Sequence, residues 1–124
     1  MSETANCSVY VLTYNSDPKK LKITLDSILA QDYNEFEILI SDDGSFKRDH
    51  FSIIKQYAKR FSCIQVLENS VNLGTVKNQQ KALEEANGDL LIGLSPGDAL
   101  YSKNTLRSLV SFYEKEKPLF FVGY

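Results

Sequence analysis

Residues 36–45 read Phe-Glu-Ile-Leu-Ile-Ser-Asp-Asp-Gly-Ser, a run whose two halves differ sharply in polarity. Residues 36–40 are almost wholly apolar, which is typical of a short strand that is buried on both faces. Residues 41–45 are polar and contain the aspartates and glycine that favour a turn. The run therefore predicts a buried strand that ends in an acidic loop.

Other extended apolar runs lie on both sides of this strand and alternate with segments of helical periodicity. Strands are expected over residues 7–13, 36–40, 63–67, 90–94 and 119–122. Helices are expected over 18–31, around 51–61, from 76 to near 87, and from a cap at Ser102 to Pro118. Strands that are apolar on both faces and joined by helices require a mainly parallel sheet with helices on both sides. The sequence therefore predicts an α/β fold.

The composition is that of a single globular domain. The chain has 124 residues, of which 43% are hydrophobic and 24% charged, and its net charge is −2. No basic field is available to attract nucleic acid, and no apolar run approaches the roughly 20 residues of a membrane span. The first residues are polar, unlike a signal peptide, and Cys7 and Cys63 are expected to be reduced core thiols. We therefore expect a soluble, cytoplasmic protein without a nucleic-acid partner.

Polar residues follow four of the expected strands at their carboxyl ends. These segments are residues 13–15, 42–45, 69–74 and 95–98. In an open parallel sheet the carboxyl ends lie along one edge, where ligands bind. Each segment alone is ordinary turn chemistry. Together they predict one crevice lined by an aromatic ring, carboxylates, amides and glycines.

Several familiar kinds of site do not match this sequence. Neither the Gly-x-Gly-x-x-Gly pattern of dinucleotide folds nor a Walker loop is present. A phospho-receiver domain carries its acidic pair after the first strand, whereas here the pair follows the second expected strand. The single histidine, His50, is expected at the surface where a helix begins, so a histidine nucleophile or zinc cluster is not indicated. The remaining carboxylates suit either a divalent cation that bridges to phosphate or acceptance of a base N–H.

The motifs as a set resemble family 2 glycosyltransferases of the GT-A fold. The matching segments are Ser8–Asn15, Leu25–Gln31, Phe36–Ser45, Asn72–Gly74 and Gly88–Asp89, in the family's order. The resemblance implies a Rossmann-like nucleotide-diphospho-sugar transferase fold. It covers roughly the first half of such a catalytic domain. We therefore expect residues 1–124 to be one N-terminal, donor-binding part of a domain that is truncated at Tyr124.

The resemblance also implies roles for individual residues. The implied substrate-binding positions are Leu12, Thr13, Tyr14, Asp42, Asp43, Gly44, Lys77, Ser95 and Gly97. Tyr14 matches the position whose ring stacks on the nucleobase. Asp43 matches the position whose carboxylate accepts from the uracil N–H. Because Asp43 is expected in a loop, Asp43→Ala is expected to weaken UDP binding without unfolding the protein. Asp42 is expected to be a structural neighbour, and Lys77 is either near the diphosphate or a solvated helix lysine.

The implied metal position is Asp98. The family carries Asp-x-Asp-Asp or a shorter acidic form here, whereas this chain has Ser95-Pro96-Gly97-Asp98 and retains only the final carboxylate. One carboxylate, phosphate oxygens and water can still hold a hard cation. The resemblance therefore implies a weak, substrate-dependent site for Mn²⁺ or Mg²⁺.

The activity that the resemblance implies is transfer of a sugar from a nucleotide-diphosphate sugar, most often a UDP-sugar, to the hydroxyl of a carbohydrate or lipid-linked acceptor. Such enzymes make polysaccharides or glycoconjugates. The catalytic base is expected beyond Tyr124, so the 124 residues alone are expected to be inactive, and the full-length protein is expected in the cytoplasm or at the inner face of the membrane. The alternatives are a nucleotide-binding module without transfer activity and a structural domain that acts through partners. An exposed sheet edge would favour a homodimer.

Overall fold

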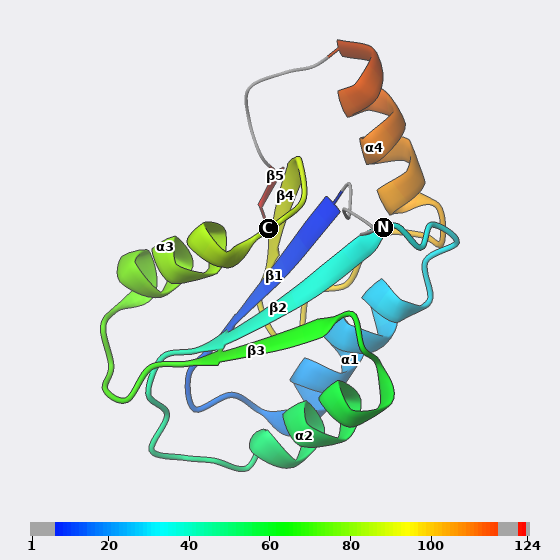
Figure 1. Cartoon of the computed structure of the whole chain (residues 1–124). Coiled ribbons are helices and arrows are strands. Elements are labelled where there is room, and N and C mark those ends of the chain that lie inside the picture. The colour runs from blue at the N-terminus through cyan, green and yellow to red at the C-terminus, as the bar shows by residue number, and fades with distance from the viewer. Residues whose placement is uncertain (1–6, 117–121, 124) are drawn as a thin grey trace.

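The computed structural model describes residues 7–116 and 122–123 and shows strands alternating with helices along the chain (Figure 1). The strands are β1 (Cys7–Thr13), β2 (Phe36–Asp42), β3 (Ile64–Glu68), β4 (Leu90–Leu94) and β5 (Val122–Gly123). The helices are α1 (Pro18–Leu29), α2 (Phe51–Arg60), α3 (Thr75–Glu85) and α4 (Thr105–Glu116). The strands form one sheet in the order β3-β2-β1-β4-β5, and every neighbouring pair is parallel. The predicted α/β fold with a parallel sheet is confirmed.

The predicted bounds of β1 and β4 match the structure, and the other elements differ by a few residues. Strand β2 continues past Ile40 because Ser41 and Asp42 still pair with β1 and β3. Helix α1 ends at Leu29, and α4 begins at Thr105 instead of directly after Ser102. Of the strand expected over 119–122, residues 119–121 lie outside the described residues, and β5 begins at Val122.

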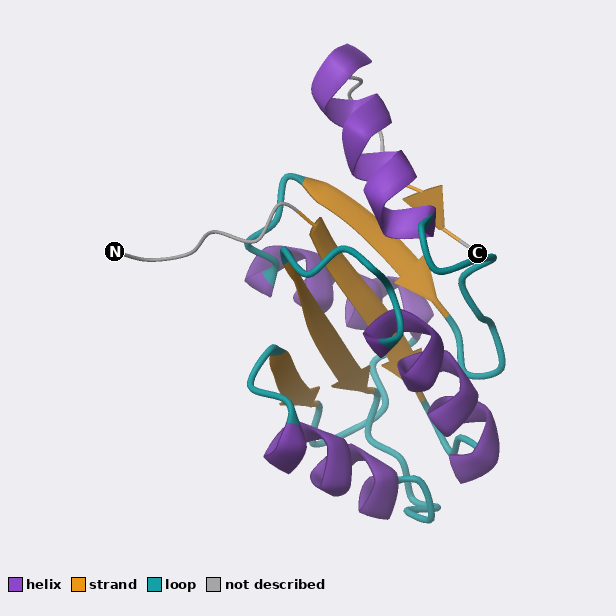
Figure 2. Cartoon of the chain, turned by 90° about the vertical axis from the view of Figure 1, so that its right-hand side faces the viewer, coloured by secondary structure: helices purple, strands orange, loops and turns teal. Residues whose placement is uncertain are grey.

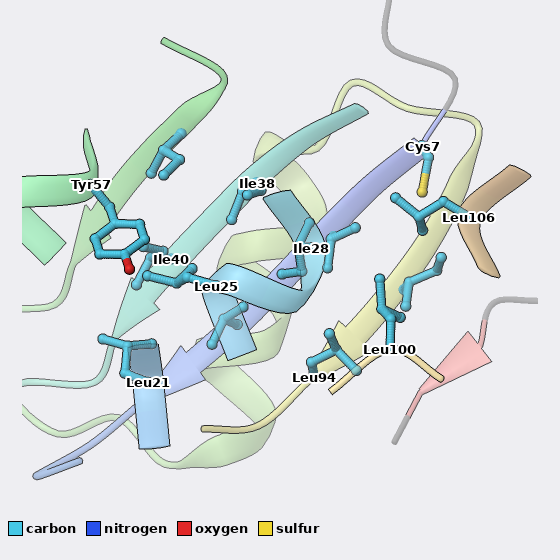
Figure 3. Packing of buried hydrophobic residues seen from close by; sticks show 14 of the residues in the cluster. Cys7, Leu21, Leu25, Ile28, Ile38, Ile40, Tyr57, Leu94, Leu100 and Leu106 are labelled. Carbon is cyan, nitrogen blue, oxygen red and sulfur yellow. The ribbon is translucent and has the colours of Figure 1, made fainter. Parts of the chain in front are cut away.

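Helices cover both faces of the sheet, as the sequence predicts (Figures 1 and 2). The larger core cluster joins the sheet to α1, α2 and α4, and Leu21, Leu25 and Ile28 of α1 lie fully buried in it (Figure 3). The smaller cluster joins Tyr10 and Leu39 to Ala82 of α3 on the opposite face. None of the helices within the described residues is long and apolar enough to cross a membrane.

Both cysteines are free, as the sequence predicts. Cys7 is buried at the start of β1 beside Leu106 of α4 (Figure 3), and burial, helped by the charge of Glu37, raises the pKa of its thiol to about 12. Burial also raises the pKa of Cys63. Both thiols are therefore protonated and weakly reactive at neutral pH.

The parallel arrangement determines where ligand-binding residues can gather. The carboxyl ends of β1, β2 and β3 point toward one edge of the sheet (Figure 1), and the amide of Asp43 donates to the carbonyl of Thr13 at 2.9 Å just beyond the strands. The amide of Asn69 donates in the same way to the carbonyl of Asp42. Backbone hydrogen bonds therefore hold the loops that follow these three strands against one another.

Candidate nucleotide site

A cleft of about 280 Å³ opens at the carboxyl edge of the sheet. Its walls come from the ends of β1, β2 and β4 and from the start of α3. The lining residues are Leu12, Thr13, Tyr14, Ser16, Asp43, Thr75, Asn78, Ser95 and Pro96. The cleft volume is close to the lower end, roughly 300 Å³, of the range for small-molecule sites. The structure thus brings five of the predicted site residues together: Leu12, Thr13, Tyr14, Asp43 and Ser95.

Tyr14 supplies the aromatic surface of this cleft. Its side chain is 44% exposed although it follows directly on a buried strand. Its ring meets the ring of Phe46 edge-to-face, with the centroids 6.2 Å apart and an interplanar angle of 75°. An aromatic ring that is exposed and yet held from one side can stack against a planar ligand.

Asp43 is buried, with 4% of its surface exposed, and it organises the loop that precedes α3. Its Oδ1 accepts from the backbone amide of Leu73 at 2.7 Å and from the side chain of Asn69 at 3.0 Å. Its Oδ2 accepts from the amide of Gly74 at 2.9 Å and from the side chain of Asn72 at 3.1 Å. These four donors occupy about as many acceptor positions as a carboxylate has.

Gly44 does not line the cleft, although sequence reasoning grouped it with the site. Its φ is +69°, and a Cβ atom there would lie 2.5 Å from the carbonyl carbon of Val71. Gly44 therefore acts indirectly: it lets the loop over residues 69–74 approach closely enough for Asp43 to bind its amides.

Gly44→Ala is expected to lower the free energy of unfolding by about 2 kcal/mol or more, because a side chain there combines backbone strain with overpacking. Gly74→Ala is a matched control, since Gly74 also has a positive φ, +96°, but nothing lies within 4 Å of its added Cβ. Urea unfolding of both variants would measure the difference. Equal losses would show that the loop adapts to the extra methyl group at Gly44.

Asp42 lies beneath the cleft and not in its wall. The side chain is fully buried, and its oxygens accept from the Thr13 hydroxyl at 2.6 Å, from the Ser45 hydroxyl and amide at 2.7 and 2.9 Å, and from His50 Nε2 at 2.9 Å. Burial by itself would raise the pKa of Asp42, but these hydrogen bonds, that of Thr13 first, outweigh burial and lower it. Asp42 is therefore buried next to the cleft and holds the segments around it together.

The prediction that His50 is a surface residue is wrong. His50 is 0% exposed, and its Nε2 reaches back across eight residues to Asp42. A buried N–H needs an acceptor within the protein, and the Asp42 carboxylate supplies one for the imidazole. His50 thus links the first turn of α2 to the end of β2.

The turn that follows β4 carries Ser95, Gly97 and the predicted metal position, Asp98. Ser95 lines the cleft, whereas Gly97 and Asp98 do not. The carboxylate of Asp98 accepts from the amide of Ser95 at 2.9 Å, and Thr24 Oγ1 of α1 donates to the Asp98 carbonyl at 2.6 Å. Asp98 is therefore held in a turn next to the cleft.

Lys77 lies on the exposed side of α3 and outside the cleft wall. The described residues contain no group of three or more histidine, cysteine or acidic side chains that could hold a metal ion. Asp98 thus offers a single carboxylate, which fits a cation only when phosphate oxygens and water complete its coordination.

Four lining residues were not predicted: Ser16, Thr75, Asn78 and Pro96. Asn78 is buried, donates to the Ser41 carbonyl at 3.0 Å and accepts from the Ser41 hydroxyl at 2.6 Å. It lies one helical turn before Ala82 on the core-facing side of α3. A polar residue at an apolar position of an amphipathic helix is the signal that would have identified it.

The chain matches the family model of Glycosyl transferase family 2 over residues 8–123. The chain therefore belongs to this family. The site at the carboxyl edge agrees with that membership, because doubly wound sheets bind nucleotides there.

Three similar proteins illustrate the relationship. Hyaluronan synthase of Streptococcus pyogenes is 33% identical over 108 residues, which are 84% of this chain and 26% of that protein. The crystal structure of S. aureus TarS 1–349 in complex with UDP-GlcNAc has a TM-score of 0.78 and 28% identity, over 90% of this chain and 32% of that one. The mannosyltransferase PcManGT from Pyrobaculum calidifontis, solved with GDP-Man and Mn²⁺, has a TM-score of 0.78 over 87% of this chain and 32% of that one. At 23% identity, the PcManGT match bears on the fold alone.

Proposed function

We propose that this chain binds the donor of a glycosyltransferase, a nucleotide-diphosphate sugar of the UDP class, and is the N-terminal part of a longer catalytic domain. The chain spans about a quarter of hyaluronan synthase and a third of the TarS structure. The observation that carries the proposal is the convergence of Tyr14, Asp43 and Ser95 on one cleft in a family 2 chain.

In this proposal the uracil stacks on the half-exposed ring of Tyr14, and Leu12 and Thr13 form the adjoining wall. Asp43 accepts from the N–H of the base. Because four internal donors already surround the Asp43 carboxylate, the base N–H has to share or displace one of them. Asn72 is the donor most easily displaced, since it is exposed and its hydrogen bond, at 3.1 Å, is the longest of the four.

Asp98 is the proposed protein ligand of Mn²⁺ or Mg²⁺. Its Oδ2 bonds to the Ser95 amide, and its Oδ1 has no hydrogen-bond partner among the described residues. A divalent cation stabilises the charge of a leaving diphosphate when sugar is transferred. Lys77 would add positive charge if the diphosphate extends toward α3, where Lys77 lies in the first turn.

Titration of the chain with UDP, with and without Mn²⁺, tests the proposal by calorimetry. We expect UDP to bind and Mn²⁺ to strengthen binding about tenfold, because Asp98 would hold the cation and the cation would offset the charge of the diphosphate. Asp98→Asn should remove the Mn²⁺ effect and leave metal-free binding unchanged. Absence of UDP binding would refute the donor site.

Binding of UDP that does not respond to Mn²⁺ would favour the second candidate function, a nucleotide-binding module without transfer activity. The single carboxylate of the Ser95–Asp98 turn favours that candidate. For the transferase we propose a catalytic base beyond Tyr124, so that the 124 residues alone bind nucleotide and do not transfer sugar.

The further parts of the proposal concern acceptor, assembly and location. We propose a carbohydrate or lipid-linked acceptor for polysaccharide or glycoconjugate synthesis, and a homodimer formed along an exposed sheet edge. A cytoplasmic location, at the inner face of the membrane in the full-length protein, agrees with two free cysteines.

A further inference from the structure

Asn15, which lies in the chain between the cleft residues Tyr14 and Ser16, has an unusual backbone conformation. Its φ is +48°, and it is the one non-glycine residue with a positive φ among the described residues. Asparagine adopts this left-handed region more readily than most residues because its short polar side chain bonds locally. Asn15 directly follows Tyr14, so its conformation sets how the chain leaves the proposed stacking residue.

The side chain of Asn15 holds the loop that follows β2. Its Oδ1 accepts from the backbone amides of Phe46 at 3.1 Å and Lys47 at 3.0 Å. Its own amide donates to the hydroxyl of Ser45 at 2.8 Å. Three hydrogen bonds therefore join this one residue to three consecutive residues that lie 30 to 32 positions later.

The residue before Tyr14 is anchored to the same loop. The Thr13 hydroxyl donates to Asp42, and the Thr13 carbonyl accepts from the amide of Asp43. Tyr14 is thus flanked on both sides by residues tied to the segment over 42–47. Phe46, whose amide Asn15 binds, is also the residue whose ring contacts the Tyr14 ring edge-to-face.

We propose that Asn15 is a positioning residue that orients Tyr14, and through it the nucleobase, by fixing Phe46 against the edge of the tyrosine ring. The inference rests on the proposed nucleotide function and adds to it a residue that does not itself line the cleft. Phe46 is 73% exposed, so burial does little to hold it, and the hydrogen bond from its backbone amide to Asn15 fixes the main-chain position from which its ring meets Tyr14. A ring held ready before the base arrives loses less freedom on binding.

Two variants separate the side chain of Asn15 from its backbone conformation. Asn15→Gly tolerates φ of +48° without strain and removes the acceptor oxygen. Asn15→Asp keeps an acceptor at the same place and also tolerates this conformation. Amide hydrogen exchange, followed by NMR without nucleotide, should be faster at Phe46 and Lys47 in Asn15→Gly and near wild type in Asn15→Asp. Unchanged exchange in Asn15→Gly would refute the positioning contact.

A double-mutant cycle with Tyr14→Ala tests whether Asn15 acts through the tyrosine. Tyr14→Ala should weaken UDP binding roughly tenfold or more, the loss expected for one base stack. Asn15→Gly should weaken it about fivefold in the wild-type background and less than about twofold in Tyr14→Ala. Equal losses in both backgrounds would overturn the proposal. Failure of the wild-type chain to bind UDP would instead overturn the proposed function, and the exchange measurement would still decide the contact.

Discussion

Replacement of Asp43 by alanine is expected to lower the free energy of unfolding by about 3 kcal/mol and to weaken UDP binding at least tenfold. The stability loss follows because the variant leaves four donors without their acceptor, and each unsatisfied buried group costs about 1–3 kcal/mol. Rehydration offsets part of that cost, since Asn72 and Leu73 are exposed. Urea unfolding and UDP titration of the same preparation measure both effects.

The sequence-based expectation that Asp43→Ala leaves the fold intact, because Asp43 is a loop residue, is therefore revised. Asp43 does lie in a loop, but its carboxylate is the point at which that loop binds the segment before α3. A variant that retains full stability and loses only UDP affinity would show that these internal hydrogen bonds contribute little.

Loss of affinity in Asp43→Ala has two possible causes, a disordered loop or a missing base contact, and Asp43→Asn separates them. Uracil presents an N–H at the ring position where cytosine presents an acceptor nitrogen, so a carboxylate favours UDP over CDP and an amide does not discriminate in this way. We expect Asp43→Asn to reduce the preference for UDP over CDP about tenfold. A parallel loss of affinity for both nucleotides would assign Asp43 a structural role alone.

The fold was predictable because its signals are local. The apolar run over 36–40 and the proline at the start of α1 each act within a few residues, and repeated strand–helix alternation leaves few topologies. The start of α4 was predicted a few residues too early because the contact that stabilises its first turn comes from a distant part of the chain. Gln31, two residues beyond the end of α1, accepts through its Oε1 from the amide of Leu106, a contact across 75 residues that no nearby signal reveals.

Long-range contacts also explain the motif over Leu25–Gln31, which is part of the family resemblance. The hydroxyl of Ser27 accepts from the amide of Leu100, and the amide group of Gln31 donates to the Ser102 carbonyl. Thr24 and Ser27 of α1, together with Gln31 just beyond its end, therefore hold the loop after β4. That loop carries Asp98, so the motif supports the proposed metal position from outside the cleft.

The candidate site was predictable in its location and only partly in its members. Parallel topology brings Tyr14, Asp43 and Ser95 to one edge whatever their partners are. Whether the side chains of Lys77 and His50 face solvent or the protein interior depends on how their helices pack. The sequence around His50 contains no signal that its partner is Asp42. Burial of a polar residue is decided by tertiary contacts, so it could be established only from the structure.

Asp42→Asn is expected to destabilise the protein by about 3 kcal/mol at neutral pH, because a neutral amide replaces the charged acceptor of several fully buried hydrogen bonds. The cost arises beneath the cleft, where Thr13, Ser45 and His50 all direct donors at Asp42. An amide at this position keeps one acceptor oxygen and places an NH₂ group against donors. Urea unfolding at about pH 7 measures the loss.

In acid, Asp42→Asn should become about as stable as the wild-type protein. The folded-state pKa of Asp42 is below its ordinary value of 3.8, so the stability that the carboxylate contributes is fully present above that value. It is lost as pH falls through the lowered folded pKa, where the wild-type carboxylate becomes neutral as well. Asp26, whose pKa is also lowered because hydrogen bonds from Lys22 and Tyr57 outweigh its burial, titrates in both proteins and cancels from the comparison. The difference in unfolding free energy between wild type and Asp42→Asn should therefore shrink as pH falls below 3.8, and a constant difference would show that the ionised form is not what the buried donors stabilise.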